Sequence, residues 1–167
     1  MGARLGLGFG ALPAVSGAGI AQLGATWTHV RLRLEGVLHP GARGGELPAA
    51  VDAPPDPLEV QLLRGQLAGC GRMPWSAAWA FDACVLGSLG ALRGRAVVGG
   101  QEATTLGASV GLRAATEWQL TGPLYGEARA DLHANLTRTR LTLEGERAWI
   151  TPAFWGELSV LGSLRFP

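Results

Sequence analysis

The stretch "LYGEARADLHANLTR", residues 124–138, alternates almost without error between small or aliphatic side chains and polar ones. Ala, Leu, Glu and Arg favour helices. However, residues two apart on a helix lie about 200° apart around its axis, so leucines and charges would scatter over every face. In a β-strand the same side chains sort onto two faces. The stretch therefore predicts a strand with Leu132 and its parity on one face and Glu127, Arg129, Asp131 and His133 on the other.

The same period of two recurs along the chain, between segments rich in turn-forming residues. In residues 30–38, for example, Val30 and the leucines oppose Arg31, Arg33 and Glu35. A change of apolar parity near residues 62 and 63 predicts a β-bulge in one of the strands. We predict strands over residues 4–12, 20–27, 30–38, 58–70, 79–92, 104–118, 124–138 and 150–166.

Eight strands joined by hairpins can close into a barrel whose interior is filled by side chains. The predicted fold class is therefore all-β, a closed antiparallel up-and-down barrel of about eight strands in one domain over residues 1–167. The longest break in the pattern, residues 39–57, is rich in Pro, Gly and acidic residues and predicts a long loop.

Composition restricts the surroundings of this barrel. Only 16% of the 167 residues are charged, against roughly 25% in ordinary soluble domains, while 47% are apolar and 26 are glycine. The net charge is +1 and no lysine is present, so no global field points to nucleic acid as a partner. The chain is short of side chains that could solubilise its surface.

Residues 5–30 contain no charged side chain and follow Arg4, which is the outline of a secretory signal peptide. The alternation in "LGLGFG" and the helix-weakening glycines and Pro13 favour a first strand instead. With that interpretation, an export signal is expected ahead of this chain.

Alternation alone does not say which face of the barrel is outside. A soluble lipocalin-like carrier with an apolar cavity and a membrane barrel with a polar lumen have the same pattern turned inside out. The polar face mixes both signs residue by residue, which suits a narrow lumen where charges neutralise one another; a solvated face with ordinary salt bridges is the alternative. The predicted lumen residues are Arg31, Arg33, Glu35, Arg113, Glu117, Glu127, Arg129, Asp131, His133, Glu157 and Arg165.

The connections favour the membrane alternative because short and long ones alternate, as they do between the two ends of outer-membrane barrels. Most aromatic residues lie beside the short turns or the C-terminus, which predicts an aromatic girdle at one membrane interface. The predicted girdle consists of Trp27, Trp75, Trp79, Trp118, Tyr125 and Phe166.

With these features the chain resembles the small eight-stranded outer-membrane barrels of Gram-negative bacteria, such as the OmpA transmembrane domain and OmpX. In texture, "CVLGSLGALRGRA" and "ELSVLGSLRFP" are similar to uncharacterised barrels of high-GC bacteria such as myxobacteria. The resemblance implies an outer-membrane location, contact with outer-membrane lipid, a monomer, and recognition of an aromatic C-terminal residue by the barrel-assembly machinery. Here Phe166 is penultimate and Pro167 follows it, which departs from that signal.

Cys70 and Cys84 flank "GRMPWSAAWAFDA". A hairpin turning at "PWSAA" would place them opposite each other on adjacent strands, within the distance that a disulfide requires. Such a disulfide would stabilise the fold by roughly 3 kcal/mol in the chain-entropy model. Two free buried thiols are the alternative, and a zinc site would need further ligands that the neighbouring sequence does not offer.

No catalytic or cofactor-binding motif accompanies these features. Asp131, His133 and several serines share the polar face, and Ser, His and an acid can together form a catalytic site, but no nucleophile is assigned by their spacing. We expect no enzyme activity, cofactor or metal. The expected function is an integral outer-membrane barrel with a side-chain-filled lumen, which conducts little or forms a narrow pore, and with loops that bind any partner. The alternatives are the soluble carrier and a lipid-modifying outer-membrane enzyme.

Overall fold

The computed structural model describes residues 2–9, 16–46, 57–96, 102–137, 140–143 and 146–164. Within these residues the chain forms eight long strands and one short hairpin. The long strands are β1 (Gly2–Phe9), β2 (Ser16–Thr26), β3 (Val30–Glu46), β4 (Pro57–Pro74), β5 (Trp79–Ala96), β6 (Glu102–Thr121), β7 (Leu124–Asn135) and β10 (Phe154–Leu164). The hairpin consists of β8 (Arg140–Leu143) and β9 (Glu146–Ile150).

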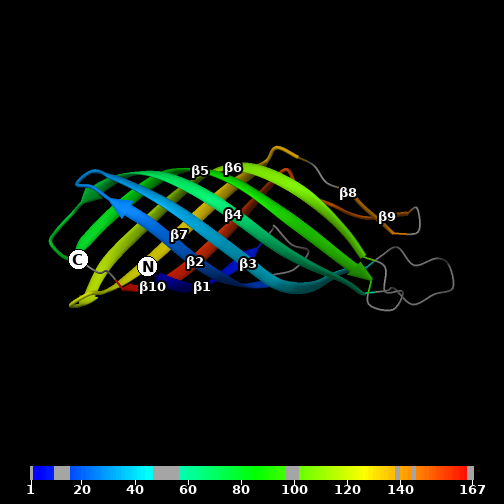
Figure 1. Ribbon diagram of the computed structural model, residues 1–167, viewed down its shortest axis with the longest axis horizontal. Coiled ribbons are helices and arrows are strands. Elements are labelled where there is room, and N and C mark those ends of the chain that lie inside the picture. Colours follow the sequence, from blue (N-terminus) through cyan, green and yellow to red (C-terminus); the bar gives the residue numbers. More distant parts are fainter. Residues whose placement is uncertain are drawn as a thin grey trace.

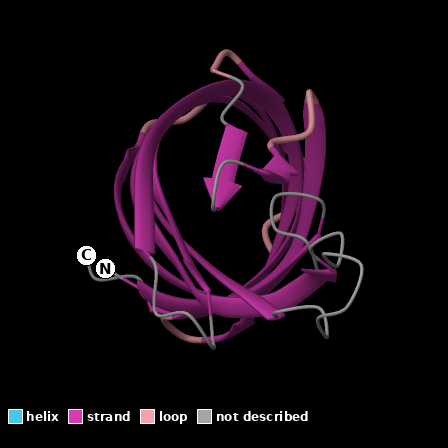
Figure 2. Ribbon diagram, turned by 90° about the vertical axis from the view of Figure 1, so that its right-hand side faces the viewer, coloured by secondary structure: helices cyan, strands magenta, loops and turns pink. Residues whose placement is uncertain are grey.

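Every long strand pairs antiparallel with its neighbours, and the order β1-β10-β7-β6-β5-β4-β3-β2 returns to β1 as a closed barrel. Figure 1 shows the tilted strands from the side, and Figure 2 shows the ring that they form. The predicted all-β, antiparallel up-and-down architecture is confirmed. No helix in the described part of the chain is long and apolar enough to cross a membrane.

The two ends of the barrel differ. At one end, called the turn end, β2 and β3, β4 and β5, and β6 and β7 are joined by residues 27–29, 75–78 and 122–123. Gly122 has a φ of 48°, a left-handed conformation that glycine adopts without steric cost. At the other end, called the loop end, the connections are longer, and β8 and β9 lie there beside the barrel mouth (Figures 1 and 2).

Several predicted boundaries are wrong, and β4 and β5 each extend four residues beyond their predicted ends, to Pro74 and Ala96. β3 continues to Glu46, so residues 39–46 are strand and not loop, while residues 47–56 lie outside the described residues. β2 begins at Ser16, four residues before the predicted start. The predicted break between the strands over residues 124–138 and 150–166 contains β8 and most of β9, and the last strand begins only at Phe154. Near the N-terminus, β1 pairs with both β2 and β10, which supports the first-strand interpretation over a signal peptide for residues 2–9.

The predicted bulge near residues 62 and 63 is also wrong. β4 pairs with β5 in one continuous register from Leu58 to Pro74. The irregularity lies in the facing strand instead, with register shifts in β3 between His39 and Ala42 and between Arg43 and Glu46. The apparent change of parity arises because Val60 and half-buried Leu62 are apolar side chains that face inward near the loop end.

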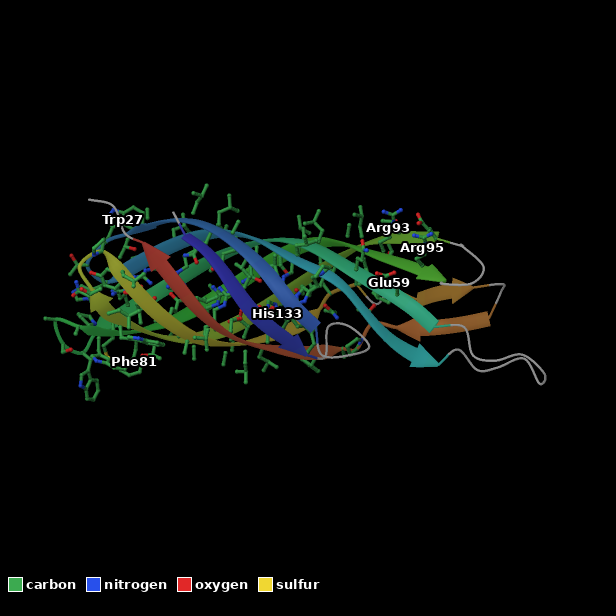
Figure 3. All side chains as sticks on the ribbon, turned by 90° about the horizontal axis from the view of Figure 1, so that it is seen from below. Trp27, Glu59, Phe81, Arg93, Arg95 and His133 are labelled. Atoms are coloured by element: carbon green, nitrogen blue, oxygen red, sulfur yellow. A yellow bond between two sulfur atoms is a disulfide. The ribbon has the colours of Figure 1, made fainter. Side chains whose placement is uncertain are left out.

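The barrel has inverted polarity. Leucine, valine and aromatic side chains point outward and are exposed, among them Leu132 at 57% and Leu89 at 72%. The buried interior holds mostly charged and polar side chains, together with a small apolar cluster that consists of Ala18, Ile20, Val37 and Leu161. Figure 3 shows side chains on both sides of the wall, with His133 inside the barrel.

Candidate functional site

Twelve charged side chains project into the lumen from the described strands. They belong to six arginines and six acidic residues, so their formal charges sum to zero. All are buried except Arg72, which is half-buried. The arginines are Arg31, Arg33, Arg64, Arg72, Arg113 and Arg129, and the acids are Glu35, Asp82, Glu117, Glu127, Asp131 and Glu157.

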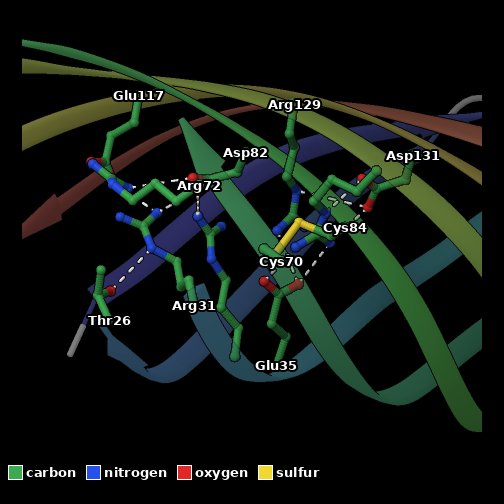
Figure 4. The surroundings of a disulfide bond; sticks show 12 residues. Thr26, Arg31, Glu35, Cys70, Arg72, Asp82, Cys84, Glu117, Arg129 and Asp131 are labelled. Atoms are coloured by element: carbon green, nitrogen blue, oxygen red, sulfur yellow. Dashed lines mark hydrogen bonds and ion pairs between the residues drawn. A yellow bond between two sulfur atoms is a disulfide. The ribbon is translucent and has the colours of Figure 1, made fainter. Parts of the chain in front are cut away.

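Asp82 on β5 is the centre of the cluster at the turn end. Its Oδ2 accepts a hydrogen bond from Arg31 Nη1 at 2.7 Å and another from Arg33 Nη2 at 2.7 Å. Its Oδ1 lies 3.4 Å from Arg72 Nη1. One carboxylate therefore compensates three guanidinium groups that come from two strands, β3 and β4 (Figure 4).

Two further carboxylates complete this cluster. Glu117 Oε1 accepts from Arg72 Nη2 at 2.7 Å, and its Oε2 lies 3.0 Å from Arg31 Nη1. Glu127 Oε1 accepts from Arg33 Nη1 at 2.7 Å. Charge-assisted hydrogen bonds of this length are the strong ones, and networks of them offset the cost of removing the charges from water.

The middle of the lumen is held by two carboxylates and two arginines. Arg113 donates from Nη1 and Nη2 to Glu35 at 2.7 and 2.9 Å, and from Nε and Nη2 to Asp131 at 2.7 Å each. Arg129 Nη1 donates to Glu35 at 2.9 Å. Glu35 lies on β3 and its partners lie on β6 and β7, so these bonds cross the barrel and fill its bore.

The Cys70–Cys84 disulfide lies beside this middle layer (Figure 4). The two cysteines are directly paired residues of β4 and β5 and both side chains are buried. The predicted disulfide is confirmed, and free thiols are excluded. It links the two strands from the lumen side, next to the apolar side chains of Ala68 and Leu86.

Toward the loop end, aromatic stacking accompanies the ion pairing. The Trp155 ring is parallel to the His133 ring, with centroids 4.0 Å apart and an angle of 8° between the planes. The Arg64 guanidinium carbon lies 4.5 Å from the centre of the Trp155 ring, and Arg64 Nη2 donates to Glu157 at 2.8 Å. Trp155 Nε1 donates to Asn135 at 3.2 Å. This stack caps the charged network.

The structure brings together ten of the eleven residues predicted to line the lumen, and all ten are buried; Arg165 lies outside the described residues. The ten are Arg31, Arg33, Glu35, Arg113, Glu117, Glu127, Arg129, Asp131, His133 and Glu157.

Sequence reasoning missed several members of the network. Arg64, Arg72 and Asp82 lie on β4 and β5, where inward positions also carry apolar side chains, so alternation of hydropathy could not assign a face. His39 was placed in a loop, yet it is buried on β3. A count of parity through each hairpin from Cys70 and Cys84 would have identified Asp82, Arg72 and Arg64 as inward-facing.

The hypothetical catalytic grouping of Asp131, His133 and a serine is not assembled. Ser109 Oγ lies 3.5 Å from His133 Nδ1 and 2.6 Å from Ser88 Oγ. Asp131, however, accepts its hydrogen bonds from Arg113, and His133 Nε2 has no hydrogen-bond partner. Within the described residues, no three His, Cys, Asp or Glu side chains are placed to hold a metal ion.

The barrel has a counterpart among solved structures. It is similar to the crystal structure of Neisserial surface protein A (NspA), with a TM-score of 0.65, over 98% of this chain and 92% of that one. The two sequences are 12% identical, so the likeness concerns the fold alone. No protein-family model and no curated protein matches the sequence.

Aromatic side chains surround the outside of the turn end. Trp27, Trp75 and Trp79 are exposed there, and Trp79 stacks on half-exposed Trp118 with centroids 5.7 Å apart. A Cβ at Gly126 would overlap the Trp118 indole, so this glycine leaves the space in which the ring lies. The prediction is wrong for Tyr125, which is half-exposed but has the inward parity of Glu127 and Arg129 on β7 and so lies on the lumen side of the wall. Phe166 lies outside the described residues.

Charged side chains mark the outside of the loop end. Arg93 and Arg95 on β5 both pair with Glu102 on β6, the latter at 3.7 Å. The hydrogen bond from Arg93 lowers the pKa of the Glu102 carboxyl, and both groups are exposed. Figure 3 shows Arg93, Arg95 and Glu59 at one end of the barrel and Trp27 and Phe81 at the other. The outer wall between them is apolar.

Proposed function

We propose that the protein is an integral outer-membrane β-barrel with a structural or interaction role, closed around a lumen that its own charged side chains fill. The observation that carries this proposal is the inverted polarity of the wall. Exposed apolar area on this scale promotes aggregation in water, whereas the hydrocarbon core of a bilayer covers it without cost. The buried charges, which no lipid could solvate, compensate one another inside.

The dimensions of the apolar wall support a membrane-crossing role. On β4 the outward side chains from Leu63 to Met73 are all apolar or glycine. That span of about 11 residues is what a tilted strand needs to cross the hydrocarbon core of a bilayer. In this proposal the aromatic turn end faces the periplasm and the charged loop end faces outward, as in outer-membrane barrels with short periplasmic turns.

The filled lumen supports a barrel that conducts little, rather than a pore. Ion pairs cross the bore at the Arg33–Glu127, Arg113–Glu35 and Arg64–Glu157 contacts, and each joins strands that are not neighbours. Recordings in planar bilayers are expected to show little or no steady current. A stable open channel of nanosiemens conductance would contradict the closed lumen.

The proposed partners are outer-membrane lipid on the apolar wall and the barrel-assembly machinery during insertion, with a monomer as the working form. We propose no enzymatic role, because the lumen charges are engaged with one another and no acid supports His133. Unchanged lipid A in a Gram-negative host that expresses the protein is the expected result. A modified lipid A would favour the enzyme alternative.

The soluble-carrier alternative requires the reverse arrangement of side chains. An apolar-ligand carrier would bury its leucines in a cavity and expose its charges, while here Leu89 and Leu106 are exposed and Arg33 and Glu127 are buried. The decisive experiment is refolding from denaturant with and without lipid vesicles. We expect a folded barrel only with vesicles or detergent, and a monodisperse folded monomer in buffer alone would overturn the proposal.

A further inference from the structure

The loop end of the lumen contains a small pocket above the charged network. The space inside it is about 50 Å³, which gives room for roughly four groups of the size of a water molecule. Strands β4, β5, β6 and β10 contribute its principal walls. These walls include Leu62, Arg64, Ser88, Leu92, Ser109 and Trp155.

Arg64 brings unused hydrogen-bond donors to this pocket. Its side chain is 3% exposed, and only Nη2 has a partner, the Glu157 carboxylate. The Nε and Nη1 nitrogens are buried without any hydrogen-bond partner. Buried donors without acceptors are costly. Arg64 lines the pocket, so an acceptor that enters it and reaches one of these nitrogens removes that cost. Other lumen arginines also have unpaired nitrogens, but the pocket does not reach them.

The charge of Arg64 is less compensated than that of other lumen arginines. Arg113 contacts two carboxylates, Glu35 and Asp131, at 2.7 Å each. Arg64 contacts only Glu157, and that carboxylate is shared with Arg129, whose Nη2 lies 3.6 Å away. The pocket therefore adjoins a buried cation whose one counterion serves two arginines.

The opposite wall adds a hydroxyl pair. Ser88 Oγ and Ser109 Oγ are 2.6 Å apart, and Ser109 Oγ also lies near His133 Nδ1. Two hydroxyls share one hydrogen bond between them, and the second hydroxyl proton is left for another acceptor when His133 Nδ1 carries its own proton. Leu62 and Leu92 add apolar contact surface, and Asn135, Thr137 and Thr151 also line the pocket. The pocket thus offers a cation and a hydroxyl donor beside a short apolar wall.

We propose that this pocket binds a small aliphatic monocarboxylate of acetate to propionate size. The carboxylate accepts a hydrogen bond from the Arg64 guanidinium, which turns an unpaired nitrogen toward it, and another from the serine pair. The alkyl group contacts Leu62 and Leu92. A single negative charge matches the single undercompensated cation, and the volume inside the pocket matches an acyl group of two or three carbons. The site opens at the loop end, so it is independent of the lipid-facing wall.

Binding is tested with the folded protein in detergent micelles and with ¹³C-carboxyl propionate as the probe, observed by NMR. Propylamine, which has the same chain and the opposite charge, is the matched ligand control. Saturable binding of propionate with no saturable binding of propylamine supports the proposal. No saturable propionate binding, or equal binding of the two ligands, overturns it.

Two variants locate the site. Arg64→Met removes the donors, and Leu92→Phe fills the pocket while it retains the Arg64–Glu157 pair. Each is expected to weaken propionate binding about tenfold or more, since a hydrogen bond to a charged group or the space itself is lost. Arg93→Gln is the control, because Arg93 follows Leu92 in the chain and is exposed outside the barrel. This variant is expected to bind propionate as the unmodified protein does.

If Arg64→Met fails to fold, Leu92→Phe decides, because it leaves the ion pairs intact. Propionate binding by folded Leu92→Phe at the original affinity overturns the assignment of the pocket. The proposed membrane role is judged separately by vesicle insertion, so a barrel that inserts but binds no propionate would refute only this inference.

Discussion

Asp131 and Leu132 are consecutive residues of β7 in opposite surroundings. Asp131 is 4% exposed and accepts two hydrogen bonds from Arg113, whereas Leu132 is 57% exposed. In a soluble barrel with an apolar interior, the leucine would be buried and the aspartate would be exposed. The comparison shows that a strand's alternation says only that its two sides differ, while the burial of charge says which side faces the lumen. On the inward face, stability depends on each charge having its specific partner. On the outward face, it depends on the absence of charge.

The largest expected effect comes from the inward face. Arg113→Leu leaves Glu35 and Asp131 with fewer partners, and breaking a buried ion pair typically costs about 3 to 5 kcal/mol. Urea unfolding in lipid vesicles measures the free energy. The double variant with Glu35→Leu should lose less than the sum of the two single losses, because the residues share one interaction. A loss below about 1 kcal/mol would show that the network is not structural.

The outward face is tested by charge instead of by loss of partners. Leu132→Arg exposes a cation to hydrocarbon and is expected to cost about 2 to 4 kcal/mol near the bilayer midplane. The matched control is Gln61→Arg, at an outward-facing, exposed position near the loop end, with an expected cost of about 0 to 1 kcal/mol. Equal losses at the two positions would contradict a lipid-covered wall.

The disulfide stabilises the inward face by covalent linkage. Replacing both Cys70 and Cys84 by alanine is expected to lower the free energy of unfolding by about 2 to 3 kcal/mol. Without the bond, the unfolded chain is no longer constrained by a loop between two residues 14 positions apart, so its conformational entropy rises. Reduction of the unmodified protein in the unfolded state should reproduce that loss. If the variant and the unmodified protein unfold at the same urea concentration, the bond contributes no stability.

The smallest effect is expected in the aromatic girdle. Gly126→Ala places a methyl group against the Trp118 ring and should cost about 1 to 2 kcal/mol through overpacking. Gly162→Ala is the control, because an added Cβ there meets no atom within 4 Å. The near-ultraviolet circular dichroism of the stacked Trp79 and Trp118 rings should change only in the first variant. Identical spectra and stabilities would place Trp118 elsewhere.

Much of the wall was predictable because its signal is local. A period of two located every long strand and the inward set on β3, β6, β7 and β10, where the buried charged residues of each strand share one parity. The prediction failed on β4, where the apolar side chains of Val60 and Leu62 face inward. It also failed in the second half of β3, where His39 is buried in the lumen beside them. There hydropathy no longer separates the faces.

The partners within the lumen were not predictable for a different reason. The Arg33–Glu127 and Arg113–Glu35 pairs join residues 94 and 78 positions apart in the chain. Their contact depends on how the strands are staggered around the barrel, and side-chain alternation carries no information about stagger. The proposed site at Arg64 depends in addition on one arginine having fewer partners than the rest, which follows only from the three-dimensional arrangement.

The most direct test of the central claim measures what surrounds Leu132. Because both native cysteines are in the disulfide, Leu132→Cys offers a single thiol for a bimane fluorophore, and Gln61→Cys offers the matched position near the loop end. In vesicles, lipids with brominated acyl chains should quench the fluorophore at position 132, and aqueous iodide should quench only that at position 61. Strong iodide quenching at position 132, without quenching by brominated chains, would contradict a lipid-facing outer wall.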